Sequence, residues 1–123
     1  MGAVLRAVRG ATTLDADSEI EVQRRVGALL TAILARNSLG PGDLVSVVFT
    51  VTEDVTSIYP ASAARALPGL SDVPMLDCRE MAVAGAVPRC IRVLVHCFTE
   101  RDRAEIQHVY LEGAESLRPD LSG

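Results

Sequence analysis

Two nearly continuous apolar runs constrain the fold of this chain more than any other feature of its sequence. They are residues 44–52, LVSVVFTVT, and residues 90–98, CIRVLVHCF, and both are rich in β-branched side chains. A strand that is apolar along its whole length is covered on both faces, whereas a half-exposed strand alternates apolar and polar residues. We therefore expect these two runs to be central strands of a sheet.

The elements around these strands follow from capping residues, hydrophobic periodicity and turn residues. Ser18 and Glu21 form a predicted capping box, in which the hydroxyl and the carboxylate each accept a hydrogen bond from an exposed backbone N–H. Apolar residues then recur at helical spacing until Asn37. The predicted order is strand 4–12, helix 18–36, strand 44–52, helix 60–67, strand 73–83, strand 90–98, one helical turn within 102–107, and strand 108–117.

This β-α-β-α-β-β-β order predicts an α/β (α+β) fold, a mixed sheet with its helices on one side, and it resembles a ferredoxin-like α/β sandwich. A chain of 123 residues has the length of one domain, which we expect to span residues 1–123. Two helices can cover only one face of such a sheet. We therefore expect another copy of the chain to cover the second face, and hence an oligomer.

Charge and cysteine content exclude several partners and compartments. The formal net charge is −4, which disfavours nucleic acid and anionic membranes as partners. The longest helical apolar stretch, residues 26–35, is about half of the ~20 residues that span a membrane. Arg6 and Arg9 interrupt any signal peptide. The three cysteines are odd in number and contain no C-x-x-C pair, so we expect a reduced, cytoplasmic protein.

Most catalytic and cofactor motifs are missing from the sequence. There is no glycine-rich phosphate loop and no Gly-x-Ser-x-Gly motif. The histidines and cysteines have no recognised metal-ligand spacing, so we expect no metal site. Asp77 and Glu80 are a conceivable acid–base pair, although most such acids are simply solvated.

Arginine side chains in otherwise apolar strands are the most specific polar feature. All 12 basic residues are Arg, and several lie in or beside the predicted strands: Arg6, Arg9, Arg79, Arg89 and Arg92. Arg92, within IRVLV, must be paired, because an isolated buried charge costs several kcal/mol or more. Two interpretations remain open. Arg92 either forms an internal ion pair, with Glu53, Asp77, Glu80 or Asp102, or it lies with other arginines at an anion site that a ligand carboxylate completes.

A series of short motifs along the whole chain carries a family resemblance. In order, they are RGATT at 9–13, FTVTED at 49–54, YPA at 59–61, VP at 73–74, REM at 79–81, CIRV at 90–93, HVYLE at 108–112 and LRPDL at 117–121. Together they resemble the small monofunctional chorismate mutases of the trimeric α/β type, the AroH class. Each motif is weak alone, but their order and spacing across so short a chain make the resemblance specific.

The resemblance implies a homotrimer that forms a pseudo-α/β barrel, with active sites between neighbouring subunits. It also implies a cofactor-free rearrangement of chorismate to prephenate, in aromatic amino acid biosynthesis. By the same resemblance, Arg9 and Tyr110 would bind a carboxylate, Arg92 would reach the ether oxygen, and Glu80 would accept the substrate hydroxyl. Further residues would line or close the pocket: Tyr59, Ala61, Arg65, Met75, Leu76, Asp77, Cys78, Arg79, Leu117 and Arg118.

Three positions depart from the family pattern. Ser62 stands where some relatives have a Lys, so a long-range charge contact would be missing. Leu76 and Asp77 occupy a stretch that is often small or sulfur-containing in relatives. An acid aimed at a dianionic substrate would repel it, but regular alternation of a strand would point Asp77 away from Glu80.

Two other functions fit the same residues. An imine or enamine hydrolase on a similar trimeric scaffold would need an activated water, so its rate would depend on pH. A non-catalytic module for small carboxylates would bind a dicarboxylate without turnover.

Overall fold

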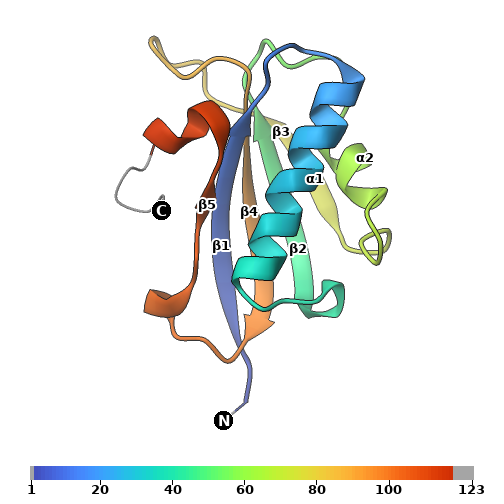
Figure 1. Cartoon of the computed structure of the whole chain (residues 1–123), viewed down its shortest axis with the longest axis vertical. Coiled ribbons are helices and arrows are strands. Elements are labelled where there is room, and N and C mark those ends of the chain that lie inside the picture. The colour runs from blue at the N-terminus through green and yellow to red at the C-terminus, as the bar shows by residue number, and fades with distance from the viewer. Residues whose placement is uncertain (1, 118–123) are drawn as a thin grey trace.

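A mixed five-stranded sheet with both helices on one face forms the described part of the chain, residues 2–117, in a computed structural model (Figure 1). The strands lie in the order β3-β2-β4-β1-β5. β4 runs antiparallel to β1 and β2, whereas β5 is parallel to β1 and β3 is parallel to β2. The elements are β1 (Val4–Thr13), α1 (Glu19–Arg36), β2 (Leu44–Val51), α2 (Pro60–Arg65), β3 (Met75–Arg79), β4 (Cys90–Thr99) and β5 (Val109–Tyr110), with 3₁₀ turns η1 (Pro41–Asp43), η2 (Arg103–Glu105) and η3 (Glu112–Ser116).

The two apolar runs form β2 and β4, which lie side by side inside the sheet, as the sequence predicts. Their helix-facing side chains pack with α1 into the main core, which is built around Phe49, Val93, Val95, Leu29 and Ile33. The predicted order of strands and helices, and the placement of the helices on one side, are confirmed.

The capping box at the start of α1 is only half formed. The Ser18 hydroxyl accepts a hydrogen bond from the Glu21 backbone N–H at 3.2 Å, as predicted. The Glu21 carboxylate does not return to Ser18. It accepts instead from the Asp15 backbone N–H, and it pairs with Arg25.

Two predicted strands are shorter than their apolar pattern suggests. The strand expected over 73–83 is confined to β3, because its only partner among the described strands, β2, ends at Val51, opposite Arg79. Beyond Glu80 the chain turns, with Gly85 at φ +82°. The strand expected over 108–117 pairs only at β5, because Glu112 adopts φ +53° and starts η3.

The sheet face opposite the helices carries several large apolar side chains that are exposed within the described part of the chain. Leu5 on β1 and Phe98 on β4 are register partners on this face, and Leu94 and Leu76 are exposed as well. We call this surface, which also carries Arg9 and Arg92, the open face. No helix within residues 2–117 has both the length and the apolar character to cross a membrane.

Candidate functional site

An arginine–glutamate pair on the open face forms the centre of the candidate site. Arg92 lies near the start of β4, in register with Thr50 on one side and Ala11 on the other. Glu80 directly follows β3, and its backbone N–H still bonds Val51 at the end of β2. The Arg92 Nε donates to Glu80 Oε1 at 2.7 Å. The sequence left Glu80 as one of four possible acidic partners of Arg92, and the structure selects it.

The ion pair with Glu80 leaves the terminal nitrogens of Arg92 available to bind a ligand. Glu80 occupies the Nε, and no described residue receives a hydrogen bond from either terminal nitrogen of Arg92. The Arg92 side chain is 42% exposed, whereas that of Glu80 is 15% exposed. A guanidinium presents five N–H donors in a rigid plane, so Arg92 can hold Glu80 and a ligand oxygen at the same time.

Arg9 and Tyr110 lie on the same side of the sheet as Arg92. Arg9 is opposite Leu94 in the β1–β4 register, which makes it the diagonal neighbour of Arg92. Tyr110 pairs with Ala11 across the short β5 ladder and is buried in a small cluster with it. No residue within the described part of the chain forms an ion pair with Arg9. These strands therefore bring the predicted carboxylate-binding residues beside the Arg92–Glu80 pair.

Surface hollows adjoin these side chains. A hollow of about 640 Å³ borders Arg92, Glu80 and the turn after β3. Its lining residues are Thr50, Arg79, Glu80, Met81, Val83, Ala84, Gly85, Ala86 and Arg92. A second hollow, of about 450 Å³, borders Arg9. Leu117 packs against the Tyr110 cluster. Arg118, the last predicted pocket residue, lies outside the described residues.

The predicted pocket residues of α2 lie on the other side of the sheet. Tyr59 precedes α2 and is exposed, whereas Ala61 is buried and donates its backbone N–H to Asp77 Oδ1 at 3.0 Å. Arg65 is exposed and donates to Ser62. Within one chain, these residues therefore do not meet Arg92.

Side chains of β3 divide between the two faces. Asp77 points toward α2, opposite to Glu80, as the alternation predicts. Burial raises the pKa of Asp77, and this effect exceeds the opposing effects of the Ala61 N–H and of Arg65. Met75 packs against the main core. Cys78 and Leu76 are exposed beside Thr50 and Val48, respectively, on the side of the open face.

Not all of the strand arginines converge. Arg6 donates its Nε to the Arg101 carbonyl at 3.2 Å, and Arg89 donates its Nε to the Leu14 carbonyl at 3.0 Å. Arg79 shares the β3 face of Asp77. Arg9 and Arg92 are the strand arginines that β1 and β4 place on the open face within the described residues.

Sequence reasoning missed Thr50 and the turn after β3. The Thr50 hydroxyl donates to Glu80 Oε1 at 3.4 Å, so Glu80 is held by two side chains. A polar residue inside the apolar run at 44–52 was a signal for it. The residues of the turn gave no such signal in the sequence, because their position beside Glu80 depends on where β3 ends. No cluster of three or more His, Cys, Asp or Glu residues suited to hold a metal ion occurs within residues 2–117.

Comparison with known proteins gives matches over most of the chain. The family model described as chorismate mutase type I matches residues 5–121. Chorismate mutase AroH of Bacillus subtilis is 40% identical over 119 residues, which cover 97% of this chain and 94% of the relative. The AroH protein of Thermus thermophilus is 42% identical, over 96% of this chain and 97% of the relative. A solved chorismate mutase from Clostridium thermocellum superposes with a TM-score of 0.87 at 37% identity, covering 90% of this chain and 98% of that one. With these matches joined to the arrangement of Arg9, Glu80, Arg92 and Tyr110, the chain belongs to the chorismate mutase type I family.

Proposed function

We propose that this protein is an isomerase that converts chorismate to prephenate, a step of aromatic amino acid biosynthesis. The observation that carries the proposal is the Arg92–Glu80 pair on the open face, with the terminal nitrogens of Arg92 free of described partners. Family membership supports the same reaction.

Arg92 supplies the electrostatic part of catalysis in this proposal. The rearrangement is intramolecular and concerted, so it uses no nucleophile and transfers no proton. Negative charge grows on the ether oxygen as the C–O bond lengthens, and a fixed donor aimed at that oxygen lowers the barrier. The rigid hold of Glu80 on the Nε edge keeps the remaining donors of Arg92 in one orientation.

Arg9, Tyr110 and Glu80 hold the substrate in its reactive shape. Chorismate is a flexible dicarboxylate, and holding it in the compact conformer removes rotational entropy from the barrier. Arg9 and Tyr110 bind a carboxylate, and Glu80 accepts a hydrogen bond from the substrate hydroxyl. Leu117, which packs against the Tyr110 cluster, closes this end of the pocket.

A neighbouring subunit completes the site, and we propose a homotrimer arranged as a pseudo-α/β barrel. Two observations support it: the open face carries exposed Leu5, Leu94 and Phe98, and the α2 residues lie on the opposite side of the sheet from Arg92. Packing the open faces of three chains together would cover these side chains. We further propose that the β3 edge of a neighbouring chain's sheet meets Arg92 and supplies the second group of predicted pocket residues; these are Tyr59, Ala61, Arg65, Met75, Leu76, Asp77, Cys78 and Arg79.

The trimer is tested by mass in solution. Sedimentation equilibrium or light scattering should give about three times the 13.1 kDa of one chain at micromolar concentration. Leu94→Glu places a charge on the open face and should lower that mass. Ile20→Glu, an equally large change on the exposed surface of α1, is the matched control and should leave the mass unchanged. A monomer of wild-type protein would overturn the proposal.

We place the enzyme in the cytoplasm, on the basis of its thiols. Cys78, Cys90 and Cys97 are all free, and two of them are buried in the sheet. Burial raises the pKa of Cys90 to about 11, which keeps it a protonated and unreactive thiol at neutral pH. Free buried thiols are typical of proteins from a reducing compartment.

Incubation with chorismate is the direct test of the function. Purified protein in chelator-containing buffer should make the ultraviolet absorbance of chorismate fall. Mass spectrometry should show a product with the mass of the substrate, because isomerisation adds and removes no atoms. Hydrolysis would instead add one water and split the substrate into two lighter products, which would indicate a hydrolase. Binding without turnover would indicate a carboxylate-binding module.

A further inference from the structure

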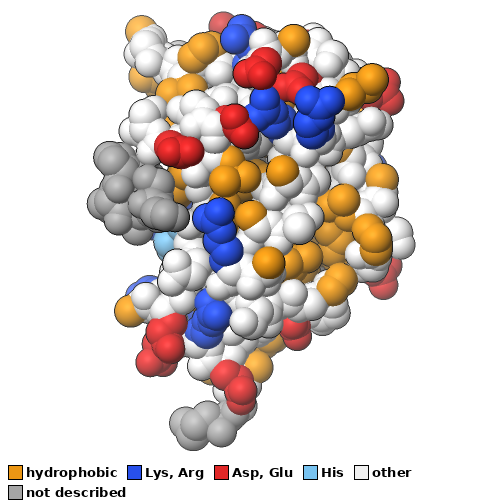
Figure 2. Space-filling model, in the orientation of Figure 1, with side chains coloured by type: hydrophobic (Ala, Val, Ile, Leu, Met, Phe, Trp, Pro, Cys, Tyr) orange, Lys and Arg blue, Asp and Glu red, His pale blue; other side chains and the backbone are white. Residues whose placement is uncertain are grey.

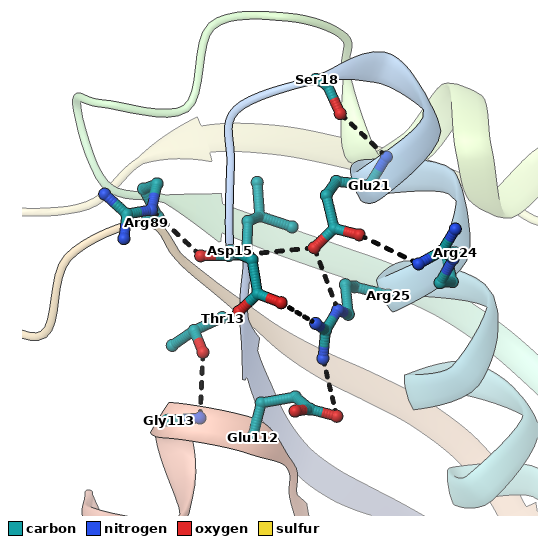
Figure 3. Close-up of polar contacts among 10 residues, drawn as sticks. Thr13, Asp15, Ser18, Glu21, Arg24, Arg25, Arg89, Glu112 and Gly113 are labelled. Atoms are coloured by element: carbon teal, nitrogen blue, oxygen red, sulfur yellow. Dashed lines mark hydrogen bonds and ion pairs between the residues drawn. The ribbon is translucent and has the colours of Figure 1, made fainter.

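Arg25 on α1 gathers carboxylates from three separate segments of the chain (Figure 3). Its Nη2 lies 2.9 Å from Asp15, in the loop after β1, and its Nε lies 3.2 Å from Glu21, in the first turn of α1. Its Nη1 lies 2.7 Å from Glu112, the first residue of η3. The Arg25 side chain is only 13% exposed. Figure 2 shows acidic and basic side chains gathered over the same end of α1.

The contact with Glu112 has the shortest of these distances. The Glu112 carboxylate contributes most to raising the pKa of Arg25, against the opposing effect of burial. Glu21 has other partners, because it also accepts from the Asp15 backbone N–H and from Arg24. Glu112 has no second salt bridge within the described residues. Loss of Arg25 therefore releases Glu112, while Glu21 keeps partners.

Glu112 occupies a backbone position that needs such a hold. Its φ of +53° lies in the left-handed region, which residues other than glycine rarely adopt. The next residue, Gly113, donates its N–H to the Thr13 hydroxyl at 2.9 Å, and a Cβ on Gly113 would lie 2.9 Å from the same oxygen. The start of η3 is thus fastened to the end of β1 by this hydrogen bond and to α1 by Arg25.

The start of η3 in turn sets the carboxylate-binding end of the site. Tyr110 lies two residues before Glu112, and Leu111 donates its N–H to the Ala11 carbonyl on β1. Ala114 and Leu117, in and just after η3, pack against Tyr110 in the same small cluster. A shift of η3 would therefore move the residues that hold the Tyr110 ring beside Arg9.

We propose that Arg25 is a positioning residue for substrate binding, which acts through Glu112 and η3 on Tyr110. It contacts no substrate itself, and the proposal rests on the function proposed above. Arginine suits this role because a rigid fork can reach three carboxylates at once, which an ammonium group does not match.

Kinetics of Arg25→Gln give the first test. The substitution should raise KM for chorismate about tenfold and leave kcat within about twofold, because a misplaced carboxylate contact weakens binding in both the ground state and the transition state. Arg24→Gln is the matched control. Arg24 is the neighbouring residue on α1, and its side chain is 68% exposed. Among residues 2–117 it reaches only Glu21, at 3.5 Å. It should leave both constants unchanged.

Glu112→Gln tests the same contact from its other end, at a half-exposed position that tolerates the change. It should reproduce the rise in KM, and the double variant with Arg25→Gln should be no worse than either single variant. An unchanged KM for Arg25→Gln, or fully additive effects of the two substitutions, would overturn the proposal.

Hydrogen–deuterium exchange provides a readout that does not depend on turnover. In Arg25→Gln the amides of Leu111 and Gly113 should exchange faster than in the wild type and in Arg24→Gln. Unchanged exchange would overturn the hold of Arg25 on η3. If the wild-type protein leaves chorismate unconverted, the proposed function is wrong and the role in substrate binding is lost with it. The exchange result would still decide whether Arg25 fastens η3.

Discussion

Arg92 shows how one side chain can satisfy both the fold and a ligand. Glu80 takes the Nε edge of the guanidinium, and Thr50 supports Glu80 from β2. A partly buried arginine without a carboxylate would be costly, so the pair solves the folding problem. Arg92 also lines the hollow, and its terminal nitrogens have no partner among the described residues, so the two interpretations of Arg92 from the sequence are compatible.

Replacement of Arg92 should show its electrostatic role. Arg92→Ala should lower kcat by about two to three decades, or about 3–4 kcal/mol in the barrier, by analogy with lost oxyanion-hole donors. Arg92→Lys should restore only part of the rate, because a point charge does not reproduce the fork. Steady-state kinetics measure both. Arg36→Ala, at the exposed end of α1, is the control and should have wild-type kinetics.

The mass in solution of Arg92→Ala should remain that of the wild type, which separates a catalytic loss from misassembly. A kcat within about fivefold of the wild type would contradict the role assigned to Arg92.

Sequence reasoning named the residues of the candidate site, but it could not name their partners. Arg9, Glu80, Arg92 and Tyr110 could be named from motifs, and strand alternation was enough to turn Asp77 away from Glu80. The partner of Arg92 could not be chosen among four acids, because the choice depends on the β2–β3 and β2–β4 registers. Local sequence does not encode these registers.

At the scale of elements, hydrophobic pattern predicted which segments are strands but not where they stop. Residues 80–83 remain apolar in part, yet β3 ends at Arg79 because β2 offers no further partner. The strand predicted over 108–117 is shortened to β5, because the chain turns at Glu112, which pairs with Arg25. Both limits come from residues distant in sequence, which a local pattern cannot contain.

Replacement by alanine should have opposite effects on stability at two glycines. In Gly10→Ala, on β1, the new Cβ would lie 2.9 Å from Ile33 Cδ1 and 3.1 Å from the Val109 carbonyl oxygen, so overpacking should cost about 1–3 kcal/mol. In Gly27→Ala, inside α1, the nearest atom would be Leu67 Cδ2 at 3.7 Å, an ordinary contact. This second change should stabilise the protein by about 0.5–1 kcal/mol, because alanine favours the helix.

Urea unfolding at one fixed protein concentration measures both variants against the wild type, since unfolding of an oligomer depends on concentration. Equal midpoints for the two variants would contradict the packing described around Gly10.

At the scale of the molecule, two helices are enough to cover one face of the sheet only. The two apolar strands, β2 and β4, still indicate that both faces are covered. The sequence predicted that a face would be left without helices, and the open face with Leu5, Leu94 and Phe98 agrees. It could not say which side chains would lie there, because that depends on register. The homotrimer stays a prediction.

Acid should destabilise the fold through three carboxylates. The Thr52 hydroxyl lowers the pKa of Asp54, and the Asp15 backbone N–H lowers that of Glu21. Burial raises the pKa of Asp17, but hydrogen bonds from Ser57 and Thr56 outweigh it and lower the value overall. A carboxyl whose pKa is lower in the folded state contributes stability above its unfolded value, and this is lost as pH falls through the folded value.

The urea midpoint should therefore be steady from pH 7 to about pH 5 and fall below the reference values of 3.8–4.5 for these groups. Asp77, whose pKa is raised, acts in the opposite direction and offsets part of the loss. A midpoint that rises on acidification would contradict the hydrogen bonds described for the three carboxylates.

The position of β4 has a consequence for how the reaction is controlled. β4 is the third of the five strands formed by the described residues, and Arg92 has a ladder partner on each side, Ala11 on β1 and Thr50 on β2. A strand that is hydrogen-bonded along both edges holds the backbone of Arg92 in a fixed position. This limits how far thermal motion can move the guanidinium charge from the breaking bond. The rate of the chemical step would then depend on a rigid sheet that is already in place before the substrate binds. Substrate entry and product exit would depend on the turns and loops outside the sheet.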